Sequence, residues 1–250
     1  MGTGPLSQSP ESKLSVGLIA ALPAEVRCLT HACPGLNIPF AITPHLVGIV
    51  CGIGSDNAAA AAKTLLNLDI EAIVSWGTAG ALARELRSGD LLLPESILAT
   101  DGRCYKADGA WLTRLRQTLQ QTSITIHNGP VAETREILNA PAQKRELHVR
   151  TGAIGVDMET AVIMKEAATG NLPCIAIRSV VDEADTAIPD ALIRHIDRYG
   201  KLQLTGMLTE IFRSPGLLGE LFRLGTAMHM ATTTLKTLVT RTNATLMYSA

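Results

Sequence analysis

The sequence predicts an α/β fold: a single-domain α/β/α sandwich with a central mixed sheet, followed by C-terminal helices. Two observations predict it. Short apolar and β-branched runs alternate with stretches of helical periodicity, which is the order of elements in α/β proteins. Several of these runs are apolar at every position, as in strands that helices cover on both faces. The hydrophobic content of 46% is enough to build a sizeable core.

Seven segments are expected to form strands. Each is short, rich in aliphatic or β-branched residues, and bounded by glycine, proline or polar residues. The predicted strands are Val16–Ala20, Leu46–Cys51, Ala72–Trp76, Leu91–Pro94, Ile124–Ile126, Ala153–Val156 and Cys174–Val181.

Four helices are expected between these strands. Asp56 and Asn57 can cap the first, because short polar side chains accept hydrogen bonds from the free N–H groups of a helix start. Pro141 suits the first turn of the third, where its missing N–H costs nothing. The predicted helices are Asp56–Leu68, Trp111–Gln121, Pro141–His148 and Glu159–Thr169.

The chain is expected to divide into a leader over residues 1–13, a main domain over 14–213 and a helical appendage over 214–250. The leader is rich in Gly, Ser and Pro and lacks the regions of a signal peptide, so we expect it to be disordered. Helical patterns cover Ile188–Arg213 and Gly216–Arg241. The second is expected to pack on the domain or on another subunit. The alternative is contact with a membrane surface, although few cations support it.

Charge and cysteine usage exclude several classes of protein. The net charge of −1 and the aromatic content of 3% do not fit a nucleic-acid binder, which carries a basic face. No run reaches the roughly 18 apolar residues of a membrane span. The five cysteines form no CxxC pair, so a reduced, cytoplasmic chain without a metal site is expected.

Two early segments carry candidate ligand-binding groups. Glu25 follows the first strand, at the edge where open α/β sheets bind ligands. The alternative is a solvated residue that the helix dipole favours. A predicted glycine loop over Ser75–Ala81 contains Thr78 and Gly80, and a similar turn ends at Gly54. Such loops bring N–H groups close to an anion or a water, although turns of this kind are common.

A third segment places two carboxylates around a methionine at a strand-to-helix junction. Asp157 and Glu159 flank Met158 there. A carboxylate can accept hydrogen bonds from both hydroxyls of a ribose diol. The alternative is an ordinary acidic helix N-terminus.

A fourth segment ends the apolar strand Cys174–Val181 with Arg178 and Asp182. Burial raises the pKa of a carboxyl group, so Asp182 can hold a proton near neutral pH and act as a general acid. The alternative is that Asp182 caps the turn that follows.

The order and spacing of these segments resemble the nucleoside phosphorylase/nucleosidase superfamily, and among its members the 5′-methylthioadenosine/S-adenosylhomocysteine nucleosidases. The resemblance runs from about Val16 to Asp185 and includes Gly77–Gly80, Asp157–Glu159 and Arg178–Asp185. It implies a phosphorylase/hydrolase-like fold, cleavage of the N-glycosidic bond of a purine nucleoside, and a homo-oligomer.

The resemblance also implies roles for individual residues. Asp182 would protonate the purine at N7, Glu159 would hold the ribose hydroxyls, and Glu25 would orient or activate an attacking water. These three form the expected catalytic set. The implied substrate-binding set is Thr78, Gly80, Gly54, Asp157, Met158, Glu136, Ile137 and Arg178.

Several positions depart from the nucleosidase pattern. Asp157 replaces the usual glutamate, and Val181 stands where nucleosidases have a serine before the acid. Glu136 takes the place of an aromatic that stacks on the base, and the region Ala99–Asp108 is shorter. The departures leave the substrate open. They also allow an alternative, a sensor that binds a nucleoside without turnover.

One subgroup accommodates the departures. The stretch Arg213–Leu218 with its apolar helix, and the turn Gly129–Val131, resemble the hopanoid-associated members. That resemblance implies removal of adenine from adenosylhopane, a nucleoside that carries a large lipid. No cofactor is expected beyond phosphate as a candidate co-substrate.

The choice between phosphate and water stays open at this level. Some phosphorylases have an arginine where this chain has Ser75, which favours water. The hopanoid-associated members are usually labelled phosphorylases, which favours phosphorolysis. Phosphate needs cations or several N–H donors. Candidate cations near the predicted loops are Arg27, Arg84, Arg87 and Arg103.

Overall fold

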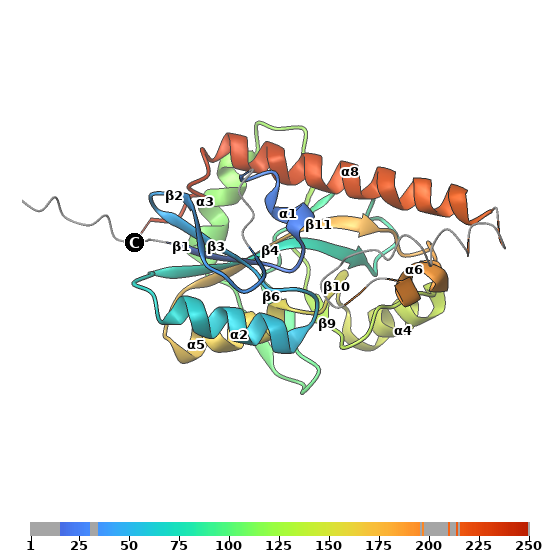
Figure 1. Cartoon of the computed structure of the whole chain (residues 1–250), viewed down its shortest axis with the longest axis horizontal. Coiled ribbons are helices and arrows are strands. Elements are labelled where there is room, and N and C mark those ends of the chain that lie inside the picture. Colours follow the sequence, from blue (N-terminus) through green and yellow to red (C-terminus); the bar gives the residue numbers. More distant parts are fainter. Residues whose placement is uncertain are drawn as a thin grey trace, which may run out of the picture.

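The computed structural model describes residues 16–30, 35–195, 197, 210, 214 and 216–249. The expected leader, residues 1–13, and most of the second half of the helical pattern Ile188–Arg213 lie outside the described residues. The described part forms the α/β/α sandwich that the sequence predicted, with the sheet between two layers of helices (Figure 1).

An 11-stranded mixed sheet forms the middle layer. β1 (Val16–Ala20) lies between β3 (Leu46–Val50) and β4 (Ala72–Ala81), and both pairings are parallel. β4 also pairs with parallel β11 (Cys174–Asp182) and, near its end, with antiparallel β10 (Gly155–Asp157). The strand β4 therefore joins every segment that the sequence singled out as carrying the chemistry.

Short strands extend the sheet on both sides. They are only two to four residues long, too short for a clear alternation, and sequence analysis missed four of them, β2, β6, β7 and β9. Each predicted strand and helix nevertheless overlaps an observed one. The short strands are β2 (Phe40–Thr43), β5 (Leu91–Leu92), β6 (Ser96–Leu98), β7 (Cys104–Lys106), β8 (Ile126–His127) and β9 (Val131–Glu133).

Two pairs of helices cover the two faces of the sheet (Figure 1). α2 (Ser55–Leu66) and α5 (Thr160–Thr169) pack on one face. α3 (Gly109–Leu119) and α8 (Leu217–Arg241) pack on the other. Burial of the strands from both sides explains their nearly continuous apolar pattern.

Successive residues of the central strand enter opposite layers. Ile73 of β4 belongs to the hydrophobic cluster beneath α2 and α5, whereas Val74 and Trp76 belong to the cluster beneath α3 and α8. Three further helices, α1 (Pro23–Val26), α4 (Pro141–Thr151) and α6 (Asp190–His195), complete the described helices.

The predicted helical pattern Gly216–Arg241 forms α8. Its C-terminal half buries Ala231, Leu235 and Leu238 against the sheet. Its N-terminal half leaves Phe222 79% exposed. No helix in the described part of the chain has the length and apolar character to span a membrane.

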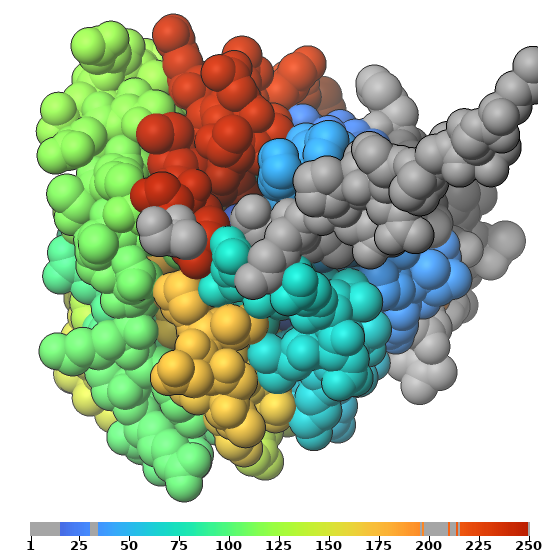
Figure 2. Space-filling model, turned by 90° about the vertical axis from the view of Figure 1, so that its left-hand side faces the viewer, coloured from blue at the N-terminus to red at the C-terminus, as the bar shows by residue number. Residues whose placement is uncertain are grey.

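The segment after α8 returns to α3. The indole N–H of Trp111 donates to the carbonyl of Leu246 at 2.6 Å, and the ring of Tyr248 packs edge-on against Trp111 with 4.9 Å between centroids. Figure 2 shows this end of the molecule, with the C-terminal segment in red beside the green α3 side. These contacts tie the last described helix to the domain.

Candidate active site

A cavity of about 280 Å³ opens where β1, β4 and β11 end. All but two of the predicted site residues line it. The exceptions, Gly54 and Arg178, contact the lining residues Glu159 and Asp157. The predicted residues in the wall are Glu25, Thr78, Gly80, Glu136, Ile137, Asp157, Met158, Glu159 and Asp182.

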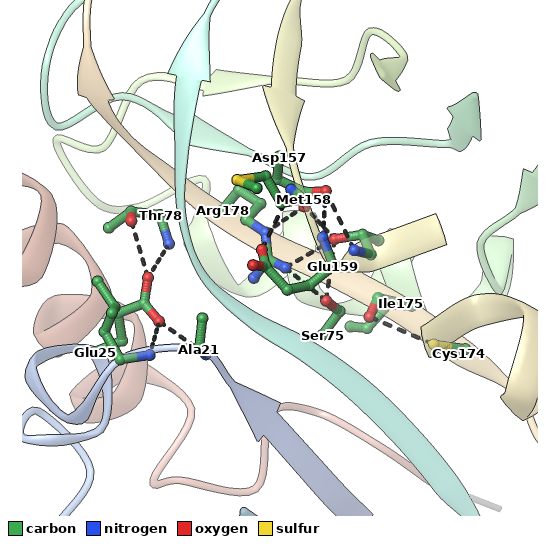
Figure 3. Close-up of polar contacts among 12 residues, drawn as sticks. Ala21, Glu25, Ser75, Thr78, Asp157, Met158, Glu159, Cys174, Ile175 and Arg178 are labelled. Atoms are coloured by element: carbon green, nitrogen blue, oxygen red, sulfur yellow. Dashed lines mark hydrogen bonds and ion pairs between the residues drawn. The ribbon is translucent and has the colours of Figure 1, made fainter. Parts of the chain in front are cut away.

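Glu25 is buried and is held by four hydrogen bonds (Figure 3). Oε2 accepts from the N–H groups of Ala21 at 3.1 Å and Leu22 at 2.9 Å. Oε1 accepts from both the N–H and the hydroxyl of Thr78, each at 2.8 Å. Pro23 starts the short helix α1, so the glutamate can reach back to the free N–H of the preceding residue. Glu25 is thus a fixed group of the site rather than a solvated one.

Burial raises the pKa of the Glu25 carboxyl group above its ordinary value. The nearby charge of Arg178 and the hydrogen bonds from Leu22 and Thr78 act in the opposite direction. The direction of the net change makes Glu25 a stronger base than an exposed glutamate.

The segment Ser75–Ala81 is not the ligand-binding loop that the sequence predicted, because β4 continues through Ala81. Its glycines instead receive two carboxylates of the protein itself. Gly77 has φ +151°, and a Cβ there would lie 2.6 Å from Oε1 of Glu25. A Cβ at Gly80 would lie 3.1 Å from Oδ1 of Asp182. Glycine is needed at both positions because the acids lie directly against the backbone.

Asp157 and Arg178 form a buried ion pair behind the cavity (Figure 3). Nε of Arg178 donates to Oδ2 of Asp157 at 2.7 Å, and Nη2 donates to the hydroxyls of Ser75 at 2.7 Å and Thr160 at 2.8 Å. Nη1 has no hydrogen-bond partner among the residues that the structure describes. The pair therefore places two opposite charges near the next acid, Glu159, and Nη1 of Arg178 is a buried donor that a ligand could use.

Glu159 lies at the start of α5 and keeps part of its carboxylate free. Oε1 accepts from the N–H of Gly54 at 2.7 Å, and Oε2 accepts from the N–H of Met158 at 3.2 Å. Burial, followed by repulsion from Asp157, raises the pKa of Glu159 to about 7, while the bond from Gly54 and the charge of Arg178 oppose the rise. Two of the roughly four lone-pair sites of a carboxylate remain for a ligand.

Asp182 ends β11 just after a bulge at Val181, where the register with β4 shifts. A bulge breaks the alternation of side chains and re-aims the next one. Burial raises the pKa of Asp182, and the ammonium group of Lys144, which contacts Oδ2, opposes the rise. Asp182 and Glu159 share one cavity, as the proposed chemistry requires.

Sequence analysis missed Lys144, although it lines the cavity. It lies on α4, whose inward face also carries Leu147 three residues later. A lysine at helical spacing from a buried leucine was the one available signal. The surrounding residues are mostly polar, so the pattern gave no clear inward face.

Sequence analysis also missed an apolar wall. Residues of α6, of the segment just before it and of the N-terminal half of α8 close one side of the cavity, although the sequence placed them in separate terminal elements. The wall consists of Ile188, Leu192, Ile193, Leu224 and Met228.

The four arginines expected as candidate cations do not line the cavity. Arg84 pairs with Asp185, Arg103 pairs with Asp101, and Arg87 donates to nearby carbonyls. Arg27 is exposed. The charge that they were expected to bring to the site is therefore absent from the described lining.

Known proteins resemble this chain in sequence. A 5′-methylthioadenosine/S-adenosylhomocysteine nucleosidase of Maridesulfovibrio salexigens is 27% identical over 153 residues, which cover 54% of this chain and 66% of that protein. The Staphylococcus aureus nucleosidase of the same name is 24% identical over 198 residues, which cover 68% of this chain and 87% of that protein.

A solved structure of the Helicobacter pylori nucleosidase, complexed with an aminopyrrolopyrimidine linked to a pyrrolidinol, has a TM-score of 0.67. The match covers 92% of this chain and 99% of that one at 15% identity, so it supports the fold alone. The family model described as the phosphorylase superfamily matches residues 16–201. The chain therefore belongs to the phosphorylase superfamily.

Proposed function

We propose that this enzyme hydrolyses the N-glycosidic bond of a 5′-substituted adenosine and releases adenine. One observation carries the proposal: Asp182, Glu159 and Glu25 line a single cavity, and burial raises the pKa of all three carboxyl groups. Separate acids in one dry cavity can serve the leaving group, the sugar and the nucleophile. Membership of the phosphorylase superfamily and similarity to named nucleosidases support the same reaction.

Asp182 and Glu159 act on the nucleoside itself in this proposal. Asp182 donates a proton to N7 of the purine, so that adenine leaves as a neutral base while the C1′–N9 bond breaks. Glu159 accepts hydrogen bonds from the vicinal ribose hydroxyls with its two unused lone-pair sites. Its negative charge also stabilises the oxocarbenium-like sugar.

Glu25 activates water through Thr78. The four hydrogen bonds to Glu25 use all of its roughly four lone-pair sites, so no site remains for a direct hydrogen bond from water. Thr78 lines the cavity, and its hydroxyl can accept from water while donating to Oε1. When water attacks C1′, its proton passes to Thr78, and the original hydroxyl proton of Thr78 passes to Glu25.

The charges in the cavity wall favour water over phosphate. Besides the three catalytic acids, Glu136 and Asp157 are ionisable lining residues. Lys144 is the one cation in the wall as far as the described residues show, and all of its donors bind protein oxygens. In the described lining a phosphate dianion would therefore meet carboxyl groups and no free cation.

The apolar wall favours a substrate whose 5′ group is apolar. Five aliphatic or thioether side chains from α6, the segment just before it and α8 line the cavity, and burying such a group stabilises binding in proportion to its apolar area. We propose a lipid-substituted adenosine such as adenosylhopane, in hopanoid biosynthesis. A ligand of that size must extend beyond a cavity of about 280 Å³, past α8, where Leu218 and Phe222 are exposed.

The proposal is tested by incubating the protein with methylthioadenosine, adenosine and a 5′-alkyl adenosine, with and without phosphate, and by assaying free adenine. We expect release without phosphate and the highest kcat/KM for the 5′-alkyl compound. Strict phosphate dependence with a ribose 1-phosphate product would establish phosphorolysis instead. Tight binding of an adenosine analogue without any base release would identify a sensor.

Assembly and membrane contact stay predictions. Sedimentation velocity tests the expected homo-oligomer. Cosedimentation with liposomes, compared with a chain truncated at Ser214, tests membrane contact through Gly216–Arg241.

A further inference from the structure

Lys144 is almost fully buried, with 1% of its surface exposed. Its ammonium group contacts the carboxylate of Asp182 and donates to the carbonyls of Glu183 at 2.8 Å and Thr186 at 3.0 Å. An ammonium group has three donors and no acceptor, so each of its hydrogens has a partner. Lysine is rarely buried this deeply unless it is paired, because removing its charge from water is costly. The fold is thus built to keep a cation at this point.

The contact fixes the orientation of the Asp182 carboxyl group. Lys144 engages Oδ2, and the carboxyl group lies against the backbone at Gly80, where a Cβ would be 3.1 Å from Oδ1 and 3.2 Å from Oδ2. Oδ1 has no hydrogen-bond partner in the described part of the protein, and Asp182 lines the cavity. Nucleosidases have a serine before the acid, whereas this chain has Val181, whose side chain cannot form a hydrogen bond. Lys144 supplies a polar side-chain contact to Asp182 instead.

We propose that Lys144 is a positioning residue for Asp182: it holds Oδ2 so that Oδ1 meets the leaving base, and its charge sets the pH at which Asp182 gives up its proton. The inference rests on the proposed function. It assigns Lys144 a role beside Asp182, the acid that is proposed to protonate the purine.

The charge of Lys144 matters most after proton transfer. When Oδ1–H of Asp182 passes its proton to N7, a carboxylate remains in a poorly hydrated cavity. The adjacent ammonium group stabilises that carboxylate, so Asp182 becomes a stronger acid than burial alone would allow.

No other cation in the described lining can stabilise the carboxylate of Asp182. The remaining ionisable lining groups, Glu25, Glu136, Asp157 and Glu159, are acids and disfavour a further negative charge. Arg178 lies on β11 as well, but its Nε is bound to Asp157 and its Nη2 to Ser75 and Thr160.

The first test compares the pH dependence of kcat/KM for adenine release in the wild type, Lys144→Met and Lys144→Arg. Activity falls at high pH as Asp182 loses its proton. Without the lysine charge, the pKa of Asp182 rises, so the alkaline limb should move up by roughly 1 to 3 pH units. Lys144→Arg keeps the charge, so its alkaline limb should lie within about half a pH unit of the wild-type limb, a smaller change than that expected for Lys144→Met. A limb at the wild-type position in folded, active Lys144→Met would overturn the proposal.

Lys63→Met is the matched control. Lys63 lies on the surface of α2, where it pairs loosely with Glu166 at 3.9 Å, and 66% of its side chain is exposed. The same chemical change there should leave the pH profile unchanged. An equal shift in this variant would show that the effect comes from net charge, which would also overturn the proposal.

A second test needs no activity. At a pH above the alkaline limb, where Asp182 is ionised, Asp182→Asn leaves the buried ammonium without its counter-ion, so its thermal midpoint should fall below that of the wild type. Adding Lys144→Met to Asp182→Asn removes the unpaired charge and should raise the midpoint again, which is the coupling that a contact pair shows. A double variant less stable than Asp182→Asn would contradict the pairing. A wild type that releases no adenine from any nucleoside would contradict the proposed function and leave this stability test valid.

Discussion

Nε of Arg178 lies 2.7 Å from Oδ2 of Asp157, and the two side chains are 3% and 2% exposed. The pair is therefore a buried charge couple, and Glu159 lies next to it. Asp157 raises the pKa of Glu159 while Arg178 lowers it, so the couple adjusts the acid that is proposed to hold the ribose. Removing one charge of the pair should therefore lower the stability of the protein and weaken substrate binding.

Replacing Asp157 with Asn should destabilise the protein strongly. The guanidinium of Arg178 would stay buried without a counter-ion, so the free energy of unfolding should fall by about 3–5 kcal/mol, measured by urea unfolding. The control is Glu146→Gln, which removes an exposed pair with Arg150 at 3.8 Å and should cost at most about 1 kcal/mol. Equal losses in the two variants would show that the buried pair has no special weight.

The acidic limb of the activity profile should report Glu159. Its pKa of about 7 means that the carboxylate, which accepts the ribose hydroxyls, becomes the major form only as pH rises through about 7. We expect kcat/KM to rise with pH across that range, because kcat/KM follows the ionisation of the free enzyme. Glu159→Gln cannot ionise and should lose this limb. A limb that persists in the variant would assign it to another group.

Thr78 should be replaceable by serine but not by valine. Thr78→Ser keeps the hydroxyl that donates to Glu25, whereas Thr78→Val keeps the size and removes the proton path. Steady-state adenine release should therefore fall by roughly 100-fold in Thr78→Val, the low end of the usual contribution of proton transfer. Similar rates for the serine and valine variants would mean that water reaches Glu25 without Thr78.

The apolar wall should discriminate between substrates by their 5′ group. Leu224→Gln places a polar side chain in the wall, so kcat/KM for a 5′-alkyl adenosine should fall about 10- to 200-fold relative to that for adenosine. Met230→Gln is the control, because Met230 lies on the same helix, is 46% exposed and does not line the cavity. If both substrates lose activity equally in Leu224→Gln, the wall is a structural element without a role in selectivity.

The location of the site could be predicted because strand ends converge. Glu25 follows β1 and Asp182 ends β11, and both strands run parallel to β4. Residues at the carboxyl ends of neighbouring parallel strands meet at one edge of the sheet, whatever their distance in sequence. Family motifs then assigned Glu159 to the same place.

The role of the glycines in β4 could not be predicted. Gly77 and Gly80 gave the segment the composition of a turn, but the strand runs through them. They are small because Glu25 and Asp182 lie against the backbone, and such a contact between distant segments leaves no local pattern. The burial of Lys144 was hidden for the same reason, since its partners come from the end of β11 and the segment after it.

The packing of α8 also bears on how the chain acquires its structure. Leu18 of the first described strand shares a hydrophobic cluster with Leu235 and Leu238 of the last described helix. Contacts this distant in sequence demand a large loss of chain entropy before they stabilise anything, which slows folding. During synthesis the apolar surface of β1 stays uncovered until α8 has been made. The nascent protein is therefore exposed to aggregation until nearly all of the described residues have emerged from the ribosome.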